Sequence, residues 1–193
     1  MMNRKFIRQV ANNPQVGFSL LEVVISGAIL MVGLIALLGV FTLAMSTTQD
    51  VQLDQIAKQK AIDALESIYT ARATQQITFA QIANTGAGGG IFTAGTVNGI
   101  LTDGPDGLAG TGDDGTTPQG TCPLPYQCEI LPGPDGVLGT ADDITRPLQD
   151  FTRTIVINNN GPNLKQVIVT IGYNNGRGQQ KNYVVQALIS QYR

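Results

Sequence analysis

The stretch NPQVGFSLLEVVISGAILMVGLIALLGV, residues 13–40, places a single acid at the start of an otherwise apolar run. After Glu22 the next charged residue is Asp50. A bilayer core of about 30 Å needs about 20 apolar helical residues, so the run is long enough to cross a membrane. Because a carboxylate in hydrocarbon is costly without a partner, Glu22 is predicted to have a pairing role.

The charges before this run predict its orientation. Arg4, Lys5 and Arg8 are the only charged residues that precede Glu22. Basic residues favour the cytoplasmic side, so we expect a single membrane span with a cytoplasmic N-terminus and an exported C-terminal part. Two other interpretations stay open on these residues alone. A secretory signal peptide would have a shorter apolar stretch with a small-residue cleavage site, and a plain signal anchor would not need Glu22.

The residues Gly17-Phe18-Ser19-Leu20-Leu21-Glu22, after a short basic leader, resemble the processing site of type IV prepilins and pseudopilins. The resemblance implies cleavage between Gly17 and Phe18 by a prepilin peptidase, and methylation of the new N-terminus to N-methylphenylalanine. It also implies that Glu22 pairs with the amino terminus of a neighbouring subunit, which would offset the cost of two lone buried charges. The alternative is that Glu22 only lies at the headgroup level.

The residues after Asp50 predict that the helix continues as an amphipathic one. Apolar side chains recur there at spacings of three and four residues, which places them on one face. They are Leu53, Ile56, Ala57, Ala61, Ala64, Leu65 and Ile68. We therefore expect one helix from near Phe18 to near Arg72, with residues 18–45 as its transmembrane and filament-core half and residues 46–75 as its amphipathic half.

The end of the chain predicts a small sheet for that face to pack on. Residues 151–159, 163–173 and 182–192 are β-branched, alternating runs separated by Asn- and Gly-rich turns. Such runs predict antiparallel strands in a meander, so residues 151–193 are expected to be the strand region of an α+β fold. A long helix followed by such a sheet resembles pilin-like subunits. Together with the N-terminal motif, this resembles most closely the minor pilins of the V type and the I-type minor pseudopilins of type II secretion.

Residues 76–150 are expected to form a long Gly- and Asp-rich loop insertion, because helix and strand periodicity is lost there. Within it, GPDGLAGTGDD (residues 104–114) is repeated as GPDGVLGTADD (residues 133–143). Ca²⁺ binds six to eight oxygen ligands on a sharply turning backbone, so we expect one or two Ca²⁺ sites. The alternative is a solvated acidic turn. The candidate ligands are Asp103, Asp106, Asp113, Asp114, Asp135, Asp142 and Asp143.

Cys122 and Cys128 lie between the repeats and would both be exported, so a disulfide is the expected state. The chain has no histidine and shows no nucleophile–base pair, which argues against an enzyme. A net charge of −2 gives no general case for nucleic-acid binding.

The expected function is that of a structural subunit, a minor pilin or minor pseudopilin, in a type IV pilus or type II secretion-like filament. Residues 1–17 would be the leader. Its partners would be the prepilin peptidase, other pilin or pseudopilin subunits, the membrane and the inner-membrane assembly platform. The protein would start in the bacterial inner membrane and move to a periplasmic or cell-surface filament. The alternative is a membrane-tethered, calcium-dependent binding or adhesion module.

Overall fold

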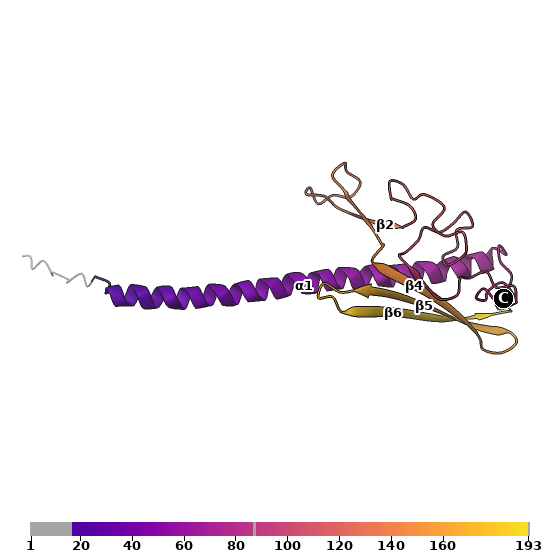
Figure 1. Cartoon of the computed structure of the whole chain (residues 1–193), viewed down its shortest axis with the longest axis horizontal. Coiled ribbons are helices and arrows are strands. Elements are labelled where there is room, and N and C mark those ends of the chain that lie inside the picture. Colours follow the sequence, from indigo (N-terminus) through magenta and orange to yellow (C-terminus); the bar gives the residue numbers. More distant parts are fainter. Residues whose placement is uncertain (1–16, 87, 193) are drawn as a thin grey trace, which may run out of the picture. The chain divides into compact units, whose positions relative to one another are not determined.

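In this computed structural model, the first secondary-structure element is a helix of 54 residues, α1 (Leu20–Ala73) (Figure 1). The structure describes residues 17–86 and 88–192, so most of the expected leader lies outside the described residues. Six strands follow α1 in this part of the chain. They are β1 (Thr96–Asn98), β2 (Cys128–Leu131), β3 (Ile144–Pro147), β4 (Phe151–Asn159), β5 (Leu164–Asn174) and β6 (Gln180–Ser190).

The chain divides into two compact units, Met1–Ala44 and Met45–Arg193. In the first unit, residues 20–44 are helical and the side chains of residues 17–44 are all exposed. This part of α1 is long and apolar enough to cross a membrane. The predicted single span is therefore consistent with the structure at the level of length and composition.

In the second unit, one face of α1 is buried against the rest of that unit. The helix ends there in a Schellman motif: Gln75 has φ 65°, the N–H of Gln76 donates to the Ala71 carbonyl (2.9 Å), and the N–H of Gln75 donates to that of Arg72 (3.3 Å). The buried face is rich in alanine, which lets other elements approach the helix axis closely. Its residues are Leu53, Ile56, Ala57, Ala61, Ala64, Ile68 and Ala71.

The predicted C-terminal sheet is confirmed. Strands β4, β5 and β6 pair antiparallel, with Ile155 opposite Val169 and Val169 opposite Val185. Burial alternates along β4 and β5, so one face of this sheet packs against the second half of α1 (Figure 1). That face includes the fully buried Val167 and Ile171.

The insertion at residues 76–150 has more regular structure than we expected. Strand β1 joins the four-stranded sheet beside β4, giving the order β1-β4-β5-β6, and β2 and β3 form a separate two-stranded hairpin. Figure 1 shows this hairpin extending away from the four-stranded sheet. These strands have three or four residues each, which is too short to produce a recognisable alternation among the surrounding glycines.

Candidate functional site

The predicted processing junction lies immediately before α1. Residues 17–19 are not helical, and the helix starts at Leu20. The Ser19 carbonyl accepts the N–H groups of Glu22 (2.9 Å) and Val23 (3.2 Å), which closes the first turn. The bond between Gly17 and Phe18 is therefore outside the helical hydrogen-bond ladder, and the Phe18 side chain is exposed. Such a backbone is open to a protease.

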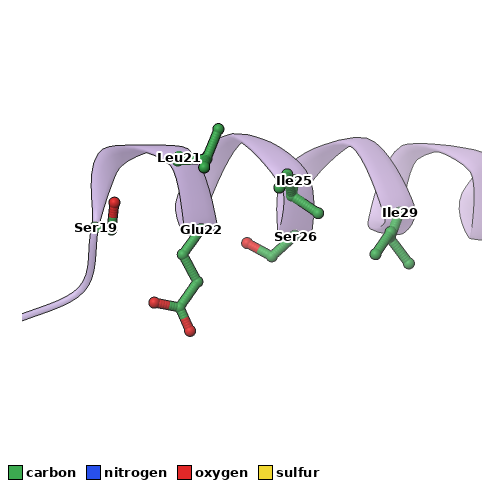
Figure 2. A pocket seen from close by; sticks show the side chains of 6 residues that line it. All are labelled: Ser19, Leu21, Glu22, Ile25, Ser26 and Ile29. Carbon is green, nitrogen blue, oxygen red and sulfur yellow. The ribbon is translucent and has the colours of Figure 1, made fainter.

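Glu22 lies in the first turn of α1 (Figure 2). A carboxylate at this position interacts favourably with the positive end of the helix dipole. Figure 2 shows its side chain extending away from the helix on the side opposite Leu21, with Ser26 one turn further along. The Ser26 hydroxyl donates to the Val23 carbonyl (3.0 Å). The sequence has no Lys or Arg from Phe18 to Ala57, so this stretch of the chain offers Glu22 no cationic side chain.

The two repeats fold into the same hydrogen-bonded loop, beginning with the first aspartate of each. Asp106 Oδ1 accepts the N–H of Leu108 at 2.8 Å, and Asp135 Oδ1 accepts the N–H of Val137 at 2.8 Å. Both are Asx turns, in which the side chain fixes the backbone two residues further on. We call residues 104–114 the first repeat loop and residues 133–143 the second repeat loop.

The middle aspartate of each loop accepts a threonine hydroxyl. Thr111 donates to Asp113 Oδ1 (2.6 Å), and Thr140 donates to Asp142 Oδ1 (2.6 Å). These bonds stabilise the charged carboxylate, so they are the main reason that the pKa of Asp113 and the pKa of Asp142 are lowered. A Cβ at Gly104 would overlap the Asp113 carboxylate. Glycine is therefore required where each loop closes on itself.

The last aspartate of each loop accepts a backbone N–H from four residues earlier. Gly110 donates to Asp114 Oδ2 at 2.8 Å, and Gly139 donates to Asp143 Oδ2 at 2.7 Å. N–H and O–H donors of the loops thus bind these carboxylates, and the hydrogen bonds are a sufficient physical reason for the loop geometry.

The expected calcium ligands are thus grouped within each loop, apart from Asp103, which accepts the side-chain amide of Gln127 (3.2 Å). Among residues 17–86 and 88–192, no group of three or more His, Cys, Asp or Glu side chains is arranged to hold a metal ion. Calcium binding by the repeats stays a prediction.

Arg153 was not among the residues singled out from the sequence, yet it organises the buried polar part of this region. Its Nη2 lies 2.5 Å from Asp114 Oδ2, and its Nη1 lies 3.8 Å from Asp103 Oδ1. Burial raises the pKa of Asp114 and the pKa of Asp103, and the Arg153 charge opposes that rise. Arg153, which lies outside the insertion, therefore supplies a basic partner to these two acids. A signal was present, since Arg153 occupies an inward position of β4 between Phe151 and Ile155.

Lys165 is a second inward-facing cation that the sequence analysis missed. Its amine donates to the carbonyls of Ile82 (2.7 Å) and Ala80 (3.3 Å) and lies 4.8 Å from the centre of the Phe79 ring. Burial lowers the pKa of this amine. Lys165 therefore ties the segment after α1 to the sheet, which is a structural role.

The predicted disulfide between Cys122 and Cys128 is confirmed, with a Cα–Cα distance of 5.7 Å. It closes a short loop that leads directly into β2. The bond therefore fixes the point at which the hairpin that carries the second repeat loop leaves the rest of the unit.

No protein-family model, curated protein or solved structure matches this chain.

Proposed function

We propose that this protein is a structural subunit, a minor pilin or minor pseudopilin, of a type IV pilus or type II secretion-like filament. A prepilin peptidase would cleave it after Gly17, and the new Phe18 N-terminus would be methylated. The mature chain would then leave the bacterial inner membrane, through an assembly platform, for a filament built with other pilin or pseudopilin subunits.

The observation that carries the proposal is the position of Glu22 in the first turn of α1, next to a non-helical Gly17–Phe18 junction. Cleavage there would place a free amino group four residues before a carboxylate that has no cationic side chain in its own stretch of helix. Two such termini on neighbouring subunits can neutralise each other in an apolar bundle, where a lone charge would be costly.

The rest of the helix supports the same proposal. Apolar side chains of residues 20–44 are exposed on all sides of the helix. Such a helix suits burial first in lipid and then among the helices of other subunits. The second half of α1 is buried on one face only, so it belongs to a folded domain outside the membrane.

The test is the N-terminus of the mature protein, isolated from membranes and from sheared surface filaments of the native host. We expect mass spectrometry to find a chain that begins with N-methylated Phe18. The matched variant Gly17→Leu should block cleavage, while Gly27→Leu, inside the helix, should not. Mature protein that begins at Met1, or beyond residue 40, would contradict the proposal.

A further inference from the structure

The two repeat loops share their internal hydrogen bonds but differ in what surrounds them. Leu108 and Ala109, in the first loop, correspond to Val137 and Leu138 in the second. The first pair is buried, with 2% of each residue exposed, whereas Val137 is 55% exposed and Leu138 is 61% exposed. One sequence motif therefore presents the same apolar positions to protein in one case and to solvent in the other.

The first repeat loop shows what this motif binds. Leu108 and Ala109 are part of the hydrophobic core that also contains Ala64 and Ile68 of α1. The Ala109 N–H donates to the Ser67 hydroxyl (3.3 Å). The loop therefore docks through its two apolar residues onto a small-residue face of a helix.

The same loop also uses its last carboxylate for docking. Asp114 Oδ2 accepts both the N–H of Gly110 and the guanidinium of Arg153. In the second loop, Asp143 Oδ2 accepts the N–H of Gly139, but no ion pair with Asp143 is found among the described residues. Asp143 Oδ1 is shielded from solvent and has no hydrogen-bond partner there.

The second repeat loop forms the tip of the hairpin made by β2 and β3, which extends away from the sheet (Figure 1). We call residues 130–145 the hairpin arm. Two more large apolar side chains are exposed on it, Ile130 and Ile144. The arm carries Asp135, Asp142 and Asp143 and no basic residue. It is therefore an exposed apolar surface with a net negative charge, which is typical of an interaction site.

We propose that the hairpin arm docks onto a second, different protein, through a surface like the one that the first repeat loop occupies in its own chain. That surface is an apolar helix face with small side chains and an arginine or lysine beside it. The basic group would pair with Asp143 as Arg153 pairs with Asp114, while Val137 and Leu138 would fill the apolar part. The inference does not rest on the proposed filament function.

A second copy of this chain does not fit as the partner on its corresponding surface. That surface is already filled by the copy's own first repeat loop. Leu138 would also have to occupy the site of Ala109, which is 2% exposed and packed in the core with Ala64. Adding three carbons in such a place would force the core apart.

The test is site-specific photo-cross-linking with the full chain in its native host, using p-benzoylphenylalanine in place of Leu138. The control position is Val184 on β6, which is 55% exposed and lies outside the arm. We expect a cross-linked product from position 138 and none from position 184. Mass spectrometry should map it to one segment of one other protein, with an arginine or lysine within or beside that segment.

Charge variants then test the pairing. Asp143→Asn keeps an oxygen to accept the Gly139 N–H but removes the charge, so the cross-link should be lost while the arm stays folded. Asp150→Asn, an exposed acid outside the arm, should leave it unchanged. Replacing the mapped basic residue of the partner with methionine should cause the same loss, and combining this change with Asp143→Asn should cause no further loss.

Four results would overturn the proposal. They are no product above that of position 184, a product between two copies of this chain, a product with lipid alone, and a protein cross-link that Asp143→Asn does not weaken.

Discussion

Arg153 and Asp114 form an almost completely buried ion pair, with 3% and 5% of their side chains exposed and 2.5 Å between Nη2 and Oδ2. The pair joins β4, which carries Arg153, to the first repeat loop, which ends at Asp114. Asp114 also accepts the N–H of Gly110 within the loop. Removing one partner of a buried pair leaves the other charge without compensation, which costs more than the pair itself contributes.

Arg153→Met should therefore lower the free energy of unfolding by about 3–5 kcal/mol. Urea unfolding of the full chain in detergent micelles, followed by the near-ultraviolet circular dichroism of its tyrosines, measures this. The control is Arg177→Met, whose guanidinium donates a long hydrogen bond to the Ser46 hydroxyl (3.4 Å). Adding Asp114→Asn to Arg153→Met should restore part of the loss, because the buried charge is then gone. A loss no greater than that of the control would contradict this account.

Thr140→Val should raise the pKa of Asp142 towards its ordinary value of 3.8, because the Thr140 hydroxyl is the main cause of the lowered value. A lowered carboxyl pKa contributes stability that is present above the ordinary pKa and is lost as pH falls through the lowered one. The variant should lose that contribution. NMR titration of the Asp142 carboxyl gives the measurement, and Thr145→Val, at an exposed position of β3, is the matched control. An unchanged Asp142 pKa would show that the hydroxyl bond does not control it.

Glu22→Ala should leave cleavage after Gly17 intact and prevent the protein from entering filaments. Without the carboxylate, the amino terminus of a neighbouring subunit would be buried alone, at a cost of several kcal/mol as an order of magnitude. Glu22→Gln keeps the shape of the side chain but removes its charge, and we expect this variant also to stay out of the filaments. The measurement is the ratio of this protein in sheared filaments to that in membranes, with Ser26→Ala as a control on the same side of the helix. Incorporation of the Ala variant at the wild-type ratio would rule out the pairing role.

Removing the disulfide should weaken the second unit modestly. Cys122 and Cys128 are separated by six positions, so the bond constrains only a short loop of the unfolded chain. Closing such a loop contributes about 2 kcal/mol. The double variant Cys122→Ser, Cys128→Ser should show that loss in urea unfolding, and Ser190→Ala serves as the control. Two reactive thiols in folded protein collected without reductant would mean that the disulfide does not form.

Millimolar Ca²⁺ should raise the melting temperature if the repeat loops bind it with the weak affinity of extracellular modules, about 10⁻⁴–10⁻³ M. Ca²⁺ would bind the lone pairs of the loop carboxylates that the Thr111 and Thr140 hydroxyls leave unused. Asp113→Asn with Asp142→Asn should abolish the shift, and Asp150→Asn should preserve it. An unchanged melting temperature, with no heat of binding by calorimetry, would leave the loops as acidic turns.

The helix, its apolar first half and the sheet that follows were predictable because each depends on local periodicity. Glu22 stood out as a candidate functional residue because one acid at the start of a long uncharged run is visible without any tertiary contact. The disulfide followed from two cysteines close together in a chain with no others.

The role of Arg153 was less visible, because its partners lie 50 and 39 residues away along the chain. The different fates of the two repeats could not be predicted at all. Their sequences give the same loop, since Asx turns and glycine closures are local. Whether that loop is buried depends on the elements that flank it: the first packs against α1, while β2 and β3 carry the second into solvent. Burial is decided by packing between distant segments, so only the folded chain places the first repeat in the core and leaves the second exposed to solvent.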